Sequence, residues 1–94
     1  MITNPIFRDC LANVSDETRA EFELSFEIAD RIDTVLKSKG LTQKDLATRM
    51  GKRESEISKW LTGRHNFTTK TIAGISLALG EPIISIAKNP ATHL

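Results

Sequence analysis

Three polar residues in the segment 54–61 carry side chains that can recognise the edges of base pairs. Lys59 can donate hydrogen bonds to O6 and N7 of guanine, Glu54 can accept one from N4 of cytosine, and Ser55 can do either. This chemistry suits recognition of a DNA groove rather than catalysis. It requires elements that hold the three side chains on one exposed face.

Other kinds of chemistry have no support in the chain. There is no Ser/His/Asp set, no paired-carboxylate pattern and no glycine-rich phosphate loop, so we expect neither an enzyme nor a cofactor. His65, His93 and Cys10 lack the spacing of a metal site, and no metal is expected. Cys10, the single cysteine, is interpreted as a bystander thiol that fits a reducing cytoplasm.

The segment 43–63 has the residue spacing of two short helices joined by a tight turn. Ala47 is small enough for two steeply crossing helices to approach, and Gly51 can adopt the positive φ that the turn needs. Ile57 and Trp60 share a helix face, so Trp60 is assigned to the core rather than to base stacking. The spacing predicts a helix-turn-helix, whose second helix enters the major groove. The alternative is an ordinary αα-hairpin in another helical bundle.

The flanking sequence predicts further helices. Ser15 can cap a long first helix that ends at Gly40, and Thr42 can cap the helix 43–50. A fourth helix, capped by Thr68 or Thr69, is expected to end at Leu79. Its residues expected to face mostly inward are Ile72, Ile75, Leu77 and Leu79.

The expected domain plan places the helix-turn-helix domain at residues 15–87, after an irregular leader (1–14) and before a flexible tail (88–94). The segment Ile83–Ala87 is rich in β-branched residues, and we predict a short strand there rather than a last helical turn. A twofold mate would supply the partner strand. The fold class is therefore all-α, a compact bundle of four to five helices with a possible C-terminal strand.

Composition and charge restrict the class of protein. A chain of 94 residues is one domain at most. No apolar run approaches the roughly 18 residues of a membrane span, and the N-terminus lacks the pattern of a secretory signal. We therefore expect a cytoplasmic protein without a membrane partner. The net charge is only +1, which is low for a DNA-binding protein. However, residues 1–38 carry eight acidic and four basic side chains, whereas residues 39–94 carry four acidic and nine basic. The basic charge is thus concentrated around the motif; the acidic part is either a solvated helix face or a surface for a basic partner.

The motifs LTQKDLA, EISKWLTG and HNFT, with Gly51 in the turn and TIAGISLALG after them, form a specific set. Over approximately residues 30–80 they resemble the Xre-type, lambda-repressor-like helix-turn-helix family. The resemblance implies a compact helical bundle that binds operator DNA as a dimer and represses transcription. The acidic first helix and the sequence motifs SKWLTG and HNFT are also similar to those of small HigA-like antitoxins of toxin–antitoxin pairs.

The resemblance also implies roles for individual residues. Gln43 matches a residue that contacts phosphate and sometimes a base, and residues on the helix 54–61 match the outward positions that read base edges. Arg53 departs from the family, because the cap position before this helix often holds Ser or Thr; the cap hydrogen bond is lost, and Arg53 can instead reach a phosphate. The candidate base-reading residues are Gln43, Glu54, Ser55 and Lys59. The candidate phosphate-binding residues are Thr42, Lys52, Arg53, Arg64, His65, Asn66, Thr69 and Lys70.

Two acidic residues, Glu54 and Glu56, complicate this assignment, because carboxylates repel phosphates. They can sharpen specificity by penalising wrong sites, or the face does not read bases at all. Two functions follow: a homodimeric, sequence-specific repressor of transcription, and an antitoxin that neutralises a toxin through its N-terminal segment while repressing its operon. A third hypothesis, a regulator that responds to a small molecule, ranks below these two because the chain is too short for a separate ligand-binding domain.

Overall fold

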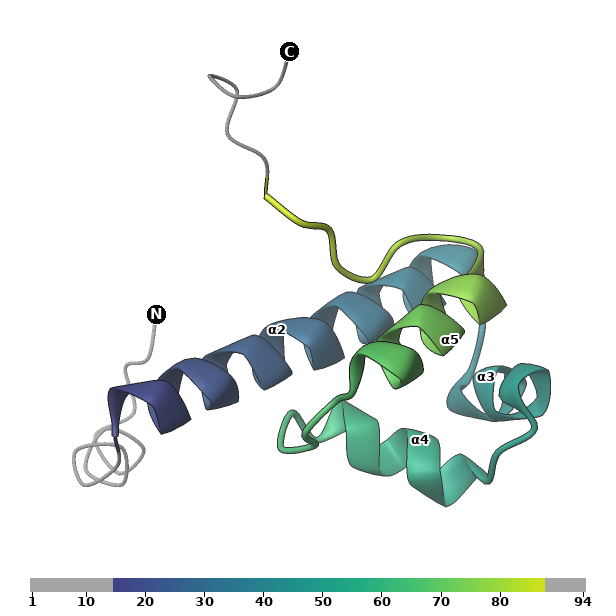
Figure 1. Ribbon diagram of the computed structural model, residues 1–94. Helices are drawn as coiled ribbons and strands as arrows, with labels where there is room; N and C mark the ends of the chain where they lie inside the picture. Colours follow the sequence, from purple (N-terminus) through teal and green to yellow (C-terminus); the bar gives the residue numbers. More distant parts are fainter. Residues whose placement is uncertain (1–14, 88–94) are drawn as a thin grey trace, which may run out of the picture.

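Four helices build the part of the chain that the computed structural model describes, residues 15–87 (Figure 1). The predicted all-α class is confirmed. The leader 1–14, with Cys10, and the tail 88–94, with His93, lie outside the described residues. The helices are α2 (Asp16–Lys39), α3 (Gln43–Met50), α4 (Glu54–Leu61) and α5 (Thr69–Leu79).

The helix ends follow the signals in the sequence. The Ser15 hydroxyl accepts a hydrogen bond from the Thr18 amide (3.1 Å), which starts α2, and Gly40 ends it in the left-handed conformation. Thr68, not Thr69, caps α5 by accepting from the Thr71 amide (3.1 Å). Local hydrogen-bonding chemistry therefore fixes these boundaries.

The core lies where α3, α4 and α5 meet the C-terminal half of α2. Trp60 is 4% exposed, and the Ile57 side chain is fully buried. Met50 and Phe67 are partly buried against this core. The fully or almost fully buried side chains are Ile32, Val35, Leu46, Ile57, Ile75 and Leu79. The core therefore holds the two helices of the motif against both of their neighbours.

The N-terminal half of α2 projects beyond the bundle (Figure 1). The expected projection is confirmed, but Phe26 on this half also contacts the body of the protein. Gly63, with φ of +79°, lies directly under the Phe26 ring, and a Cβ at this position would collide with it. Gly63 is therefore required both for its backbone conformation and for the close approach of α2.

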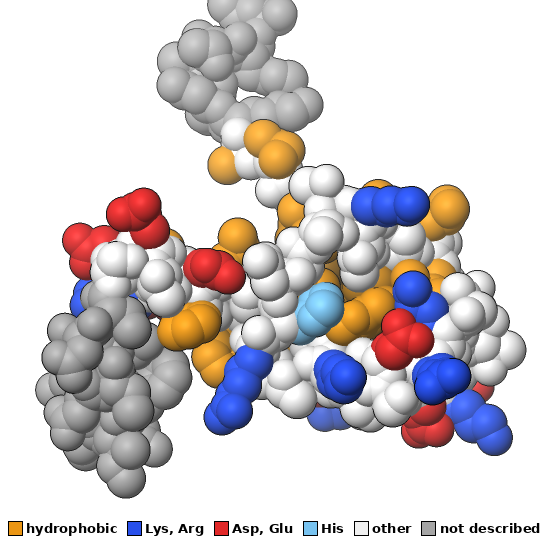
Figure 2. Space-filling model, turned by 60° about the horizontal axis from the view of Figure 1, so that its bottom comes forward, with side chains coloured by type: hydrophobic (Ala, Val, Ile, Leu, Met, Phe, Trp, Pro, Cys, Tyr) orange, Lys and Arg blue, Asp and Glu red, His pale blue; other side chains and the backbone are white. Residues whose placement is uncertain are grey.

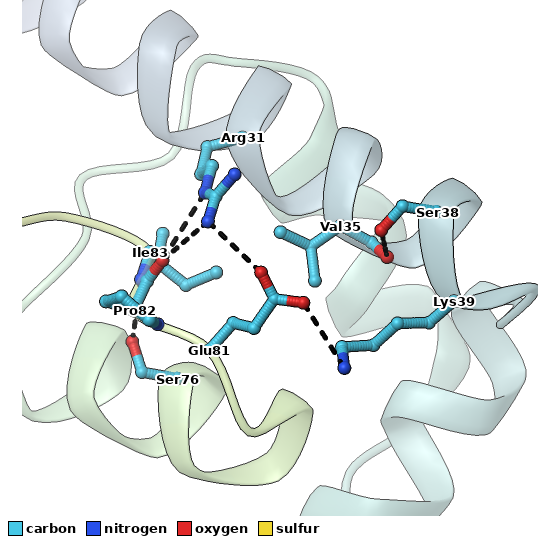
Figure 3. A network of polar contacts seen from close by, with 8 residues as sticks. All are labelled: Arg31, Val35, Ser38, Lys39, Ser76, Glu81, Pro82 and Ile83. Carbon is cyan, nitrogen blue, oxygen red and sulfur yellow. Dashed lines mark hydrogen bonds and ion pairs between the residues drawn. The ribbon is translucent and has the colours of Figure 1, made fainter.

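The segment after α5 corrects one prediction: Ile83–Ala87 forms no strand within residues 15–87. Ile83 is buried, and its amide donates to the Ser76 hydroxyl (3.1 Å) instead of to a neighbouring strand. The Arg31 guanidinium donates to the Pro82 carbonyl (3.1 Å) and pairs with Glu81, as Figure 3 shows. The backbone after α5 is thus attached to α5 and α2 by side chains, and β-branched composition alone does not make a strand.

A second prediction is wrong for one residue of α5. Leu77 was expected to face inward, but it is 86% exposed. Ile75 and Leu79 are buried, and Leu77 lies two residues, or about 200°, from each of them on the helix. An apolar side chain at that position necessarily points away from the core.

The start of α3 gives a pH-dependent prediction. The Thr42 amide donates to the Asp45 carboxylate (2.8 Å), and the Asp45 amide donates to the Thr42 hydroxyl (3.1 Å), which forms a capping box. The hydrogen bond from the Thr42 amide is the main cause that lowers the pKa of Asp45. Because the folded pKa is lower than the unfolded one, this residue stabilises the fold at neutral pH, and the stabilisation is lost as the pH falls through the folded pKa.

We therefore expect Asp45→Asn to lower the melting temperature at pH 7, and we expect the difference from the wild type to shrink below about pH 4. Thermal melts followed by circular dichroism at pH 7, 5, 4 and 3 measure this difference. A difference that stays constant over this range would contradict the role of the Asp45 charge in the cap.

Candidate nucleic-acid interface

One face of α4 is open to solvent along its whole length. Ser55, Ser58 and Lys59 are exposed, and three- and four-residue steps place them on the same side of the helix. Ile57 and Trp60 on the opposite side are buried. Figure 2, which brings the α4 side of the molecule forward, shows several Lys and Arg side chains spread over this face, with a His and a few acidic and hydrophobic side chains among them. The core thus fixes α4 while its donor and acceptor side chains remain available.

A hydrogen bond joins this face to the start of α3. The Ser58 hydroxyl donates to Oε1 of Gln43 at 2.7 Å. With its oxygen engaged, the Gln43 amide group keeps its two N–H donors for an outside acceptor, such as a phosphate oxygen. Ser58 belongs to this interface, but it was not among the site residues predicted from the sequence. Its polar character and three-residue step from Ser55 were visible in the sequence, but its partner on α3 was not.

The two acidic residues of α4 differ in their surroundings. Glu54 is exposed, whereas Glu56 is half-buried. The Glu56 carboxylate accepts from the Arg53 amide (3.4 Å) and lies 4.0 Å from Nζ of Lys52. Glu56 therefore satisfies the Arg53 amide, which is the reciprocal half of a capping box, while Arg53 makes no side-chain cap hydrogen bond to the first amides of α4. Part of its negative charge is balanced there, and Glu54 is the acidic group that remains open beside Ser55.

The residues proposed for phosphate contact around the α3–α4 turn are exposed. Lys52 and Arg53 lie in the turn itself, beside Gly51, which ends α3 at φ of +66°. Thr42 is also exposed, but its amide and the hydroxyl oxygen are engaged in the capping box, which leaves the hydroxyl proton as its donor. The turn can therefore present Arg53 and Lys52, the latter near Glu56, and the start of α3 can present the Thr42 hydroxyl donor.

The loop between α4 and α5 is held by aromatic contacts. The His65 ring meets the Phe67 ring edge to face, with centroids 4.9 Å apart, and lies 6.1 Å from the Trp60 ring. The Arg64 amide donates to the Thr62 hydroxyl (3.3 Å), while the Arg64 side chain is exposed. His65 is thus half-buried in an aromatic cluster that positions the basic loop.

The beginning of α5 adds backbone donors. Thr69 and Lys70 are exposed in its first turn, after the Thr68 cap, and Asn66 is exposed in the loop before it. The first amides of a helix have no acceptor within the helix, and the helix dipole makes this end favourable for an anion. These residues can therefore bind phosphate groups, while the exposed face of α4 can contact base edges.

Two other kinds of site are not found in the part of the chain that the structure describes. Residues 15–87 contain no group of three or more His, Cys, Asp or Glu side chains able to hold a metal ion. Within the same residues, none of the helices is long and apolar enough to cross a membrane.

The chain was compared with protein families, curated proteins and solved structures. A family model described as Helix-turn-helix matches residues 32–86, which is more than half of the chain. The matched range begins within α2 and includes all of α3, α4 and α5. No curated protein and no solved structure matches the chain.

Proposed function

The chain belongs to the helix-turn-helix family of DNA-binding regulators, and from this premise we propose that it represses transcription as a homodimer that reads a specific operator. The observation that carries the proposal is the exposed α4 face, on which Ser55 and Lys59 are available while Ile57 is buried beneath them. Gln43 is joined to this face from α3. Donors and acceptors on one rigid helix are what base-edge readout requires.

Two arguments, from affinity and from geometry, support the proposed homodimer. An eight-residue helix offers few base contacts, and the open carboxylate of Glu54 repels phosphate. A twofold pair would double the contacts and place the two α4 helices in major grooves about 34 Å apart, one helical turn of DNA. Repression is the role that the resemblance to the Xre-type family implies, since its members typically occupy operator DNA.

A binding titration tests this function. The full chain is titrated by fluorescence anisotropy against DNA from upstream of its own gene and against a scrambled duplex, at several salt concentrations. We expect tighter binding to the upstream DNA and a steep loss of affinity with salt, because each neutralised phosphate releases counterions. Equal binding to both duplexes would contradict a specific operator there.

The contact between Gln43 and Ser58 gives a finer prediction. Ser58→Ala removes the group that orients the Gln43 amide, and a neutral hydrogen bond contributes about 0.5–1.5 kcal/mol. We therefore expect DNA affinity to fall about 2- to 12-fold, and we expect Ser58→Ala to add little once Gln43→Ala is present. The same titration on the two single variants and the double variant measures this coupling. Strictly additive losses would show that the two side chains act separately.

A second candidate function is that of a HigA-like antitoxin. It is supported by the N-terminal half of α2, which projects from the bundle (Figure 1) and carries the exposed carboxylates of Glu23 and Glu27. A protein partner with basic character would bind such a surface, and both functions are compatible in one chain. Co-expression with a short basic open reading frame adjoining the gene tests this function. We expect the two products to co-purify, and their failure to do so would remove its main support.

A further inference from the structure

A groove lies between α2 and α4, and Gln43 at the start of α3 and Thr62 after α4 also line it, so it adjoins the proposed DNA face. It has a volume of about 450 Å³, within the range of sites that hold small ligands or side chains. Phe26 and Ala29 of α2 and Leu61 of α4 form its apolar surface, and Asp30 and Asp33 add carboxylates. The groove therefore combines apolar contact with negative charge.

The charge in the groove is incompletely balanced. Asp33 pairs with Nζ of Lys37 at 2.9 Å, and the Lys37 side chain is 78% exposed, so this pair is open to water. Asp30 is exposed and interacts electrostatically with the same Lys37, so one cation serves both carboxylates. Two carboxylates close together favour a cation, and a planar guanidinium can be held by both.

The acidic character continues along the projecting half of α2. Glu23, Glu27 and Asp30 follow at four- and three-residue steps, so they form a row on one side of the helix. Figure 2 shows red side chains along this half of α2 and orange ones where it meets the body of the protein. The row leads from the exposed part of α2 into the groove.

We propose that this groove docks a basic, amphipathic segment of a partner protein. An arginine or lysine of that segment binds Asp30 and Asp33, its aliphatic stem or an adjacent apolar side chain covers Phe26 and Leu61, and further basic residues follow the acidic row. The occupant is a partner rather than a second copy, because the excess positive charge of this chain surrounds α3 to α5, which the DNA proposal uses. The inference deepens the second candidate function, binding of a protein partner, and rests on it.

A peptide selection tests the groove without knowledge of the natural partner. A random 12-residue library displayed on phage is selected against the immobilised full chain, and enriched peptides are synthesised for anisotropy titrations. Each is measured on the wild type, on Asp30→Asn/Asp33→Asn, and on Glu17→Gln/Glu21→Gln as a control with the same charge change. The two control positions are exposed on α2 and do not line the groove. Circular dichroism melts verify that both double variants are folded.

We expect the enriched peptides to carry Arg or Lys next to aliphatic residues. Their affinity for the groove variant should be lower than for the wild type by a factor of about ten or more. Their affinity for the control variant should stay within about twofold of the wild type. Enrichment of uncharged peptides, failure of enrichment, or equal weakening by both variants would overturn the proposal. The assay contains no DNA, so its failure leaves the DNA proposal untouched. If the product of the adjoining gene binds the groove variant as tightly as the wild type, the groove is wrong while the partner function stands.

Discussion

Replacing Lys59 with alanine is expected to weaken operator binding by about 1–3 kcal/mol, which is about 5- to 150-fold, the range for loss of a good base contact. Lys59 is exposed on α4 in line with Ser55, and adding Ser55→Ala is expected to increase the loss. Both changes leave the buried side of α4 intact, so the fold should be unaffected. Anisotropy titrations against the upstream DNA and a scrambled duplex measure the effect.

The control for this experiment is Lys37→Ala, which removes one positive charge from α2 instead of α4. Lys37 is exposed and paired with Asp33, so its loss should change affinity little and equally for both duplexes. Loss of a base contact must instead reduce the preference for the operator over the scrambled DNA. If Lys59→Ala combined with Ser55→Ala leaves binding unchanged, the assigned reading face is wrong.

Truncating Trp60 to alanine is expected to have the largest effect on stability, about 3–5 kcal/mol, because it removes a large buried side chain and leaves a cavity. Trp60 is 4% exposed and lies close to the rings of His65 and Phe67. A domain of this size is stabilised by about 5–15 kcal/mol in total, so the variant should be close to unfolding. The loop that carries His65 should lose its position as well.

Urea denaturation followed by circular dichroism measures the free energy of unfolding of this variant. Leu77→Ala is the control, because it also truncates a large apolar side chain, but one that is 86% exposed; its effect should stay within about 0.5 kcal/mol. A similar small change for Trp60→Ala would contradict its position in the core.

The sequence predicted the parts of the fold that depend on neighbouring residues. Ser15, Thr42 and Gly51 act within one turn of their own positions, through caps and a positive φ, so the helix ends could be read directly. Ile57 and Trp60 were assigned to the core because three-residue spacing gives a helix one buried side. The same helical spacing places Leu77 of α5 on the solvent-exposed side, opposite the buried Ile75 and Leu79.

Contacts between distant parts of the chain could not be read in this way. The hydrogen bond between Gln43 and Ser58 joins residues 15 positions apart, and it depends on how α3 crosses α4. The Arg31 contact with Pro82 spans 51 positions and holds the segment that was expected to be a strand. The base-reading and phosphate-binding assignments depend on bound DNA and stay predictions.

The central claim, that the exposed face of α4 reads base edges, is tested most directly by selection of bound DNA from a random duplex pool. The wild type, Ser55→Ala/Lys59→Ala and Lys37→Ala chains are used in parallel. We expect the wild type and Lys37→Ala to enrich the same motif, with half-sites about 10 base pairs apart, and we expect the α4 variant to lose or change that motif. An identical motif for all three proteins, or none for the wild type, would contradict the claim.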